Sequence, residues 1–216
     1  MITLEDLSAI IENGDVDSVR GAVAELIDAG VSSGDIIQNA VVPGMINVGR
    51  KFETQQIFIP EMLRAARAVR LGNELLCARA GRPNIVTPKK IVLGTVYGDL
   101  HDIGKDLVAL AMRLVGINVI DLGVDVPPEQ FVRAVNDDEN VVFVGISALL
   151  TVTLPAMKRT VEMLRGSKAS DRITIFVGGA PVTKKFAKEI GADIYTDSAF
   201  AAAEKARLLL QERGEL

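Results

Sequence analysis

From residue 89 onward, short apolar segments alternate strictly with longer segments of helical period. The short segments lack the polar alternation of a half-exposed strand, so each is expected to be buried on both faces. Strands of that kind belong to parallel sheets that helices cover on both sides. The predicted strands are 90–97, 118–122, 141–146, 173–177 and 193–195, and the predicted helices are 105–115, 128–136, 154–164, 182–190 and 199–212.

Five strands in this pattern predict an α/β flavodoxin-like (Rossmann-like) five-stranded parallel sheet with strand order 2-1-3-4-5. In that order ligands bind beyond the carboxyl ends of the strands, at the switch point between strands 1 and 3. Three suggestive stretches fall at those ends: 98–104, 147–153 and 178–181. We therefore expect one crevice lined by a histidine-bearing loop, several hydroxyl groups and two adjacent glycines.

Residues 1–80 carry helical periodicity instead. Four segments with short connections predict an all-α four-helix bundle before the sheet. The third segment, 35–51, contains Pro43, which is expected to kink it or restart it near the middle. Residues 81–88 contain glycine, proline and polar residues and predict a linker. The expected organisation is a helical cap domain at 1–80, this linker, and a flavodoxin-like domain at 89–216.

Composition narrows the classes of function. Apolar residues make up 49% of the chain, enough for a sizeable core, and the formal charge is −4 without a basic stripe, which argues against a nucleic-acid partner. The first residues lack the features of a signal peptide, no apolar run reaches membrane-spanning length, and one cysteine excludes an internal disulfide. We expect a cytoplasmic protein that binds neither nucleic acid nor membrane.

His101 is the only histidine in the chain, and Asp99 and Asp102 stand on either side of it. A neutral imidazole is a good transition-metal ligand, and a carboxylate commonly accepts its second ring N–H. Asp99, two residues earlier, could fold back to do so. For an isolated Asp-x-His pair, the plainer alternative is a histidine that caps a helix or is satisfied in the interior.

Two further kinds of site fit the loop poorly. A bare zinc ion needs three or four protein ligands, and Cys77 lies far away in a helical segment. A metal at His101 would therefore arrive inside a cofactor that supplies its other ligands. A phosphate-binding loop would need a different glycine spacing and a hydroxyl after Lys105, where the chain has Asp106.

Bulky apolar residues crowd the stretch from Met45 to Met62. Such residues usually fill a core. They could also form an apolar lid over a flat hydrophobic ligand, and the sequence leaves both possibilities open.

Three motifs together resemble the cobalamin-binding signature of corrinoid proteins: Asp99-x-His101-x-x-Gly104, Ser147-x-Leu149 and Gly178-Gly179. The helical half, through 43–53 and 58–61, resembles the cap domain of corrinoid methyltransferase proteins. The resemblance covers essentially the whole chain. It points to the small corrinoid proteins of methanol, methylamine or methoxyarene methyltransferase systems, which are similar to the cobalamin-binding module of methionine synthase.

This resemblance implies a cofactor, cobalamin or a related corrinoid containing cobalt, held between the two domains with its dimethylbenzimidazole detached. His101 would be the lower axial ligand, oriented by Asp99, with Thr153 or a neighbour extending the chain of hydrogen bonds towards solvent. Cobalt would cycle between methylcob(III)alamin and cob(I)alamin. His101 would leave it on demethylation, and Asp99 would help to hold the proton that the imidazole then gains.

The resemblance also implies the set of residues in contact with the cofactor. Phe52 and Ile59 would shield its upper face, and Gln38, where related proteins can carry glutamate, could approach that face. The complete set is Gly98, Asp99, Leu100, His101, Asp102, Ile103, Gly104, Ser147, Leu149, Thr151, Thr153, Gly178, Gly179, Ala180, Phe52, Ile59, Gln38 and Met45.

The implied function is that of a methyl carrier in one-carbon metabolism, such as methanogenesis or acetogenesis. A substrate:corrinoid methyltransferase would load the methyl group, and a corrinoid:thiol or corrinoid:folate methyltransferase would remove it. A reductive activase is a candidate third partner. No complete catalytic cycle is expected of this chain alone. The alternatives are a cobalamin-binding sensor, an adenosylcobalamin mutase subunit, or a receiver-type signalling domain, which would need an acid where this chain has Ser147.

Overall fold

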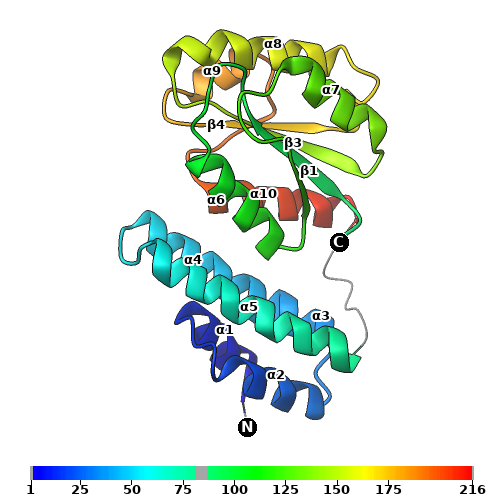
Figure 1. The fold of residues 1–216 in the computed structure, drawn as a ribbon. Coiled ribbons are helices and arrows are strands. Elements are labelled where there is room, and N and C mark those ends of the chain that lie inside the picture. Colours follow the sequence, from blue (N-terminus) through cyan, green and yellow to red (C-terminus); the bar gives the residue numbers. More distant parts are fainter. Residues whose placement is uncertain (1, 81–86, 216) are drawn as a thin grey trace. The chain divides into compact units, whose positions relative to one another are not determined.

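The computed structural model describes residues 2–80 and 87–215. The chain divides into two compact units, Met1–Val86 and Thr87–Leu216 (Figure 1). We call the described parts, 2–80 and 87–215, the helical unit and the sheet unit. Most of the predicted linker, residues 81–86, lies outside the described residues, so the assignment of a cap, a linker and a cofactor-binding domain stays a prediction. Within the described residues no helix is both long and apolar enough to cross a membrane.

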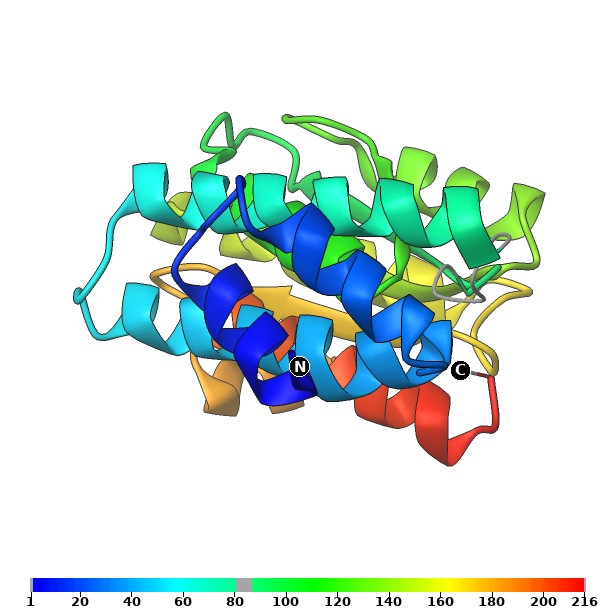
Figure 2. The same ribbon diagram turned by 90° about the horizontal axis from the view of Figure 1, so that it is seen from below.

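The helical unit consists of four helical stretches, as predicted. Its first two helices pack across the last two, which lie side by side and are joined by a turn at 54–58 (Figure 2). The apolar stripe of the first helix buries Leu7 and Ile11, which explains the helical spacing of its apolar residues. The elements are α1 (Leu4–Glu12), α2 (Val19–Asp28), a continuous stretch of α3 (Ser33–Ile36), η1 (Ile37–Val41) and α4 (Val42–Glu53), and α5 (Ile59–Ala80).

The third stretch restarts beside Pro43, which is one of the two outcomes predicted for this proline. Residues Ile37–Val41 form a π-helical turn, and the Val42 N–H donates to the Ile37 carbonyl five residues back. Pro43 then lies in the first turn of α4. Proline lacks an N–H and its ring clashes with the preceding turn of an α-helix, and a wider turn relieves that conflict. The irregular turn therefore comes before the proline, and α4 begins with Pro43 in its first turn.

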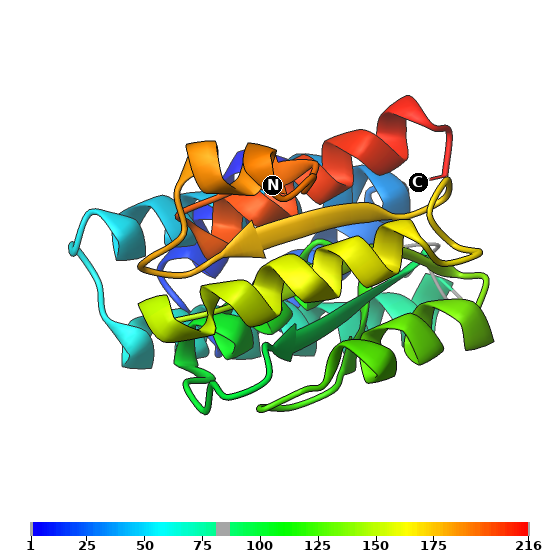
Figure 3. The same ribbon diagram turned by 90° about the horizontal axis from the view of Figure 1, so that it is seen from above.

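The sheet unit contains five parallel strands in the order β2-β1-β3-β4-β5, which confirms the predicted topology. Helices α6 and α10 cover one face of the sheet and α7, α8 and α9 cover the other (Figures 1 and 3). The strands are β1 (Lys90–Thr95), β2 (Asn118–Asp121), β3 (Val141–Ser147), β4 (Thr174–Gly178) and β5 (Ile194–Tyr195). The helices are α6 (Ile103–Leu114), α7 (Pro128–Asp137), α8 (Leu154–Arg165), α9 (Lys184–Glu189) and α10 (Ala199–Glu212), with a short 3-10 turn, η2 (Thr151–Thr153), before α8.

The central strands are buried on both faces, as their continuous apolar runs indicated. Val92 and Val144 belong to the core under α7, α8 and α9, whereas Ile91 and Phe143 belong to the core under α6 and α10. Successive side chains of a strand point to opposite faces, so a strand between two helical layers needs apolar residues at every position.

The strand register brings the three suggestive loops to one edge of the sheet. Thr95 at the end of β1 pairs with Ser147 at the end of β3, and Ser147 pairs with Gly178 at the end of β4. The loops that follow these strands therefore begin side by side, at the switch point where the chain order reverses.

Gly179 lies where the loop after β4 passes the loop after β3. A Cβ atom at Gly179 would lie 1.9 Å from the Ala148 carbonyl oxygen, and the residue has φ +119°, which other residues rarely adopt. Only glycine therefore allows these two loops to approach so closely.

We expect Gly179→Ala to destabilise the sheet unit more than Gly191→Ala does. Gly191 also has positive φ (+80°), but a Cβ atom there would have no neighbour within 4 Å. Gly191→Ala, the control, should lower the free energy of unfolding by about 1–2 kcal/mol through its backbone conformation alone. Gly179→Ala should lower it clearly more, because its Cβ atom would also clash with the Ala148 carbonyl oxygen. The chain has no tryptophan, and Tyr97 and Tyr195 both lie in the sheet unit. Urea unfolding followed by tyrosine emission therefore reports on this unit, and equal losses would contradict the close approach.

Candidate functional site

The loop after β1 reverses direction so that Asp99 points inward and His101 points outward. Gly98 has φ +83°, and the Asp99 N–H donates to the Val96 carbonyl at 3.0 Å. The Asp99 side chain is 0% exposed, whereas that of His101 is 49% exposed. Oδ1 of Asp99 accepts hydrogen bonds from the backbone N–H of His101 at 3.1 Å and from its Nδ1 at 2.8 Å. The carboxylate thus holds both the backbone and the ring of His101.

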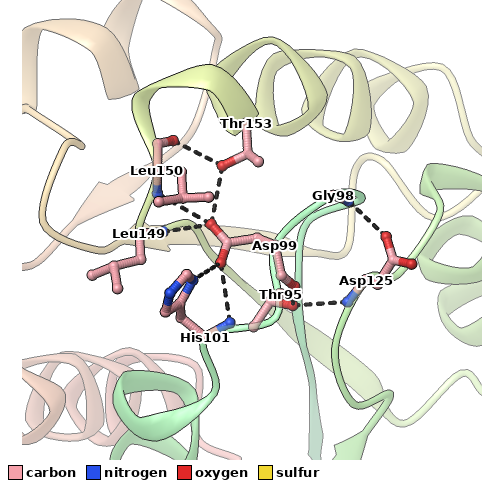
Figure 4. Close-up of polar contacts among 8 residues, drawn as sticks. All are labelled: Thr95, Gly98, Asp99, His101, Asp125, Leu149, Leu150 and Thr153. Carbon is pink, nitrogen blue, oxygen red and sulfur yellow. Dashed lines mark hydrogen bonds and ion pairs between the residues drawn. The ribbon is translucent and has the colours of Figure 1, made fainter.

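The second oxygen of Asp99 is held by the loop after β3 (Figure 4). Oδ2 accepts hydrogen bonds from the N–H groups of Leu149 (2.7 Å) and Leu150 (3.2 Å) and from the Thr153 hydroxyl (3.0 Å). Burial alone would raise the pKa of Asp99, but the hydrogen bonds from Leu149, His101 and Leu150 outweigh it and lower the pKa to about 2. The carboxylate is therefore ionised at neutral pH.

An ionised carboxylate can only accept hydrogen bonds, so Nδ1 of His101 must carry a proton. The neutral imidazole then has its lone pair on Nε2. Among the described residues, Nε2 has no hydrogen-bond partner. This is the tautomer and orientation that a metal-binding histidine requires.

Bulky apolar side chains are exposed around this histidine. Ile103 is 72% exposed and Val152 is 80% exposed, and Tyr97, Leu100, Leu149 and Leu150 are exposed on the same two loops. Exposed apolar groups gathered in this way mark a binding surface. Among the residues described, no cluster of three or more His, Cys, Asp or Glu side chains could hold a metal ion. The surface therefore fits a large apolar group that brings a metal with most of its ligands.

Gly104 gives a second indication of such a group. It lies in the first turn of α6, and a Cβ atom there would have no neighbour within 4 Å. Alanine is the better helix former, so the chain itself gives no reason for glycine at this position. Close approach of a ligand three residues from His101 would give one.

The structure gathers the predicted residues of the sheet unit at the carboxyl edge of the sheet. Asp102 precedes α6 and makes no side-chain capping bond there. Ser147 is half-buried, Thr151 and Ala180 are exposed, and Thr153 is 5% exposed. The Thr153 hydroxyl contacts Asp99, as expected. The same hydroxyl is buried and lies 2.8 Å from the Leu150 carbonyl oxygen, so the chain of hydrogen bonds does not lead towards solvent there.

The other predicted residues lie in the helical unit. Met45 is 1% exposed and belongs to the core of that unit, Phe52 is half-buried, and Ile59 is 46% exposed at the start of α5. Gln38 is half-buried in the π-helical turn η1. Contact of these four residues with a cofactor stays a prediction.

Sequence reasoning missed Thr95 and Asp125, which support the loop from its other side. Thr95 is fully buried, and its hydroxyl donates to the Asp99 carbonyl at 2.5 Å. Asp125 lies in the loop after β2 and accepts a hydrogen bond from the Gly98 N–H at 2.6 Å. The strand order could have indicated Asp125, because β2 is the other neighbour of β1 and its loop must begin at the same edge.

The comparisons with known proteins show the family of the chain. A family model described as a B12 binding domain matches residues 89–204, and a second model with that description matches residues 3–76. The chain is 38% identical over 210 residues to dimethylamine corrinoid protein 1 of Methanosarcina mazei, a match that covers 96% of this chain and 95% of the relative.

Two solved structures resemble the chain over most of its length. One is a cobalamin-binding protein from Desulfitobacterium hafniense, with TM-score 0.80, 28% identity, and coverage of 96% of this chain and 98% of that one. The other is the methanol:cobalamin methyltransferase complex MtaBC from Methanosarcina barkeri, with TM-score 0.72, 31% identity, and coverage of 95% and 78%.

The fold and site therefore define a cobalamin-binding α/β protein preceded by a helical unit. The chain belongs to the B12-binding corrinoid protein family. Its cofactor is cobalamin or a related corrinoid, and its function is to carry methyl groups. The relatives and structures named above give no support to a sensor or a mutase subunit.

We expect Asp99→Asn to lower the free energy of unfolding of the sheet unit by about 2–4 kcal/mol at pH 7, because the amide cannot replace all the accepted hydrogen bonds. The pKa of Asp99 is lowered from 3.8 to about 2. The ionised group therefore contributes stability above pH 4, and this contribution is lost as the pH falls towards 2. Urea unfolding at pH 7, 4 and 2.5 should show the gap between wild type and variant narrowing below pH 4. A gap that stays constant would contradict the low pKa.

Proposed function

We propose that this corrinoid protein carries a methyl group on cobalt between two methyltransferases. The first is a substrate:corrinoid methyltransferase, and the second passes the methyl group to a thiol or a folate. When bound, the corrinoid supplies the cobalt centre that takes up and gives up the methyl group. The observation that carries the proposal is the half-exposed His101 ring, whose Nδ1 is bonded to a buried, ionised carboxylate and whose Nε2 has no partner within the described part of the chain.

In this proposal Asp99 works through the ring of His101. It fixes the tautomer, orients the ring, and makes Nε2 a stronger ligand. Its two bonds to His101, one to the backbone N–H and one to Nδ1, hold the ring so that Nε2 is left for the metal.

The loops after β3 and β4 are proposed to hold the nucleotide tail of the corrinoid. Their adjacency in the strand register supports this role. Hydroxyl groups at the same edge offer hydrogen bonds to a polar tail. The residues assigned to this channel are Ser147, Leu149, Thr151, Gly178, Gly179 and Ala180.

The helical unit is proposed to shield the methyl-bearing face of the cofactor. The exposure of Phe58 just before α5 and of Ile59 and Leu63 in its first turns supports this, because bulky apolar side chains exposed together mark a binding surface. Phe52 and Ile59 are the proposed shielding residues, with Gln38 close to the same face and Met45 as a further predicted contact.

The comparisons support the class of partner. The MtaBC structure is a methyltransferase complex, and the relative from Methanosarcina mazei takes its name from dimethylamine. We accordingly propose a small methylated compound, such as a methylamine, as the donor. The thiol or folate acceptor, a reductive activase and a cytoplasmic location belong to the same proposal.

We expect hydroxocobalamin to stay with the wild type through gel filtration, with an absorption spectrum that differs from the free cofactor. His101→Gly should shift that spectrum and weaken retention by about tenfold or more, because the axial ligand is lost. Added imidazole should restore the wild-type spectrum. If the wild type retains no cofactor, the corrinoid function is wrong, and if the two spectra are identical, His101 is not the axial ligand.

We expect Gly104→Ala to weaken cofactor binding without lowering the stability of the sheet unit. Alanine in the first turn of α6 should leave the sheet unit as stable as the wild type, or more stable by up to about 1 kcal/mol. Retention of hydroxocobalamin should nevertheless fall, because the added methyl group occupies space reserved for the corrinoid. Urea unfolding and gel filtration measure the two effects. Unchanged retention would show that the space at Gly104 is not used.

A further inference from the structure

We propose that Asp125, in the loop between β2 and α7, is a positioning residue for the axial ligand. It holds the turn from which Asp99 and His101 project and so sets the direction of His101 Nε2. This inference rests on the proposed function in one respect, namely that His101 binds cobalt.

Asp125 contacts the histidine loop at two points (Figure 4). Its carboxylate Oδ1 accepts a hydrogen bond from the Gly98 N–H at 2.6 Å. Its own N–H lies 3.0 Å from both the Asp99 carbonyl oxygen and the Thr95 hydroxyl oxygen. The Thr95 hydroxyl donates in turn to the Asp99 carbonyl. The peptide groups on both sides of the turn are thus tied to the loop after β2.

The backbone conformation of Asp125 is one that glycine adopts more easily, which draws attention to what the aspartate side chain contributes. Asp125 has φ +53°, in the left-handed region, and Gln55 is the only other non-glycine residue of the described chain with positive φ. Glycine adopts this conformation most easily, and aspartate and asparagine tolerate it better than most residues. A side chain kept in a conformation that favours glycine must contribute something that glycine cannot, and here it contributes the acceptor for Gly98.

Asp99 is consequently held from two opposite sides. The loop after β3 binds its carboxylate through Leu149, Leu150 and Thr153. On the other side, the Asp125 N–H and the hydroxyl of Thr95, the last residue of β1, bind its carbonyl oxygen. In Figure 4 Asp125 lies on the far side of Asp99 from Leu149, Leu150 and Thr153. Losing the side-chain bond from Asp125 to the Gly98 N–H would loosen the turn before Asp99 while its carboxylate stays anchored. The carboxylate could then pivot, and the ring bonded to it would pivot as well.

A residue that only stabilised the fold would not change how often the ring reaches cobalt in protein that has folded and bound the cofactor. The test therefore measures ligation itself. Protein uniformly labelled with ¹⁵N is reconstituted with hydroxocobalamin and reduced to the Co(II) form. In electron paramagnetic resonance, a protein ¹⁵N ligand splits each cobalt line into a doublet. The cofactor's own ¹⁴N base gives a triplet, so the two ligands are distinguishable.

Three variants separate the hydrogen bond from the backbone conformation. Asp125→Gly keeps the left-handed conformation and loses the acceptor, Asp125→Asn keeps both, and Asp125→Ala loses both. At a pH where the wild type shows both ligated and unligated histidine, Asp125→Gly should lower their ratio by about three- to tenfold, the usual effect of one hydrogen bond. Asp125→Asn should stay within about twofold of the wild type, and Asp125→Ala should be at least as impaired as Asp125→Gly.

Glu129→Ala is the matched control, because Glu129 is an exposed carboxylate four residues further on that faces Arg159 at 3.6 Å. It should leave the ratio unchanged. Wild-type ratios in both Asp125→Gly and Asp125→Ala would overturn the inference, and so would an Asp125→Asn variant as impaired as Asp125→Gly. A wild type that binds the cofactor without any ¹⁵N doublet would instead overturn histidine ligation itself.

A second measurement needs no cofactor. The Gly98 amide resonance in the unreconstituted protein should move upfield in Asp125→Gly and stay in place in Asp125→Asn, since only the former lacks the acceptor. If the resonance does not move in Asp125→Gly, Asp125 does not hold the turn, and the inference fails whatever the corrinoid does.

Discussion

The buried carboxylate of Asp99 is the interaction on which the site depends. It accepts five hydrogen bonds, two from His101 and three from the loop after β3. A carboxylate without exposure to water is stable only when donors replace its hydration, so the two loops must stay together for either to keep its conformation. The same bonds keep Asp99 ionised and determine the tautomer of the only histidine in the chain.

The parallel sheet makes this convergence possible. Its order places β1 between β2 and β3, so the histidine loop begins beside loops that come from distant parts of the chain. The loop after β3 supplies the amides that bind the Asp99 carboxylate, and the loop after β2 supplies Asp125, which binds the turn before it. Gly179 allows the loop after β4 to pass against Ala148. A flexible loop carrying the same Asp-x-His pair would have none of these partners.

Much of the fold could be predicted, because each prediction depended on a strong local pattern. Continuous apolar runs between amphipathic segments predicted five buried parallel strands in the observed order, and the helical spacing of apolar residues predicted the bundle. Pro43 was expected to kink its helix or restart it, and α4 does start at Val42 with Pro43 in its first turn. The π-helical turn at Ile37–Val41 that precedes it was not predicted, because it depends on how the backbone accommodates the proline. The predicted site residues of the sheet unit do converge, whereas their contacts with a cofactor remain predictions.

The sequence by itself determined the class of the fold, the loop that bears His101, and the motif that points to a corrinoid, because periodicity and residue spacing are local properties. Only the tertiary structure decided which groups surround that loop. Neither the amides of Leu149 and Leu150 nor the position of Asp125 beside Gly98 could be read from spacing, since 50 residues separate Leu149 from Asp99 and 27 separate Asp125 from Gly98. The pKa of Asp99, and with it the tautomer of His101, follows from those distant donors. The local sequence therefore determines where the metal-binding histidine lies, and the tertiary structure determines the ionisation of Asp99 and the tautomer of that histidine.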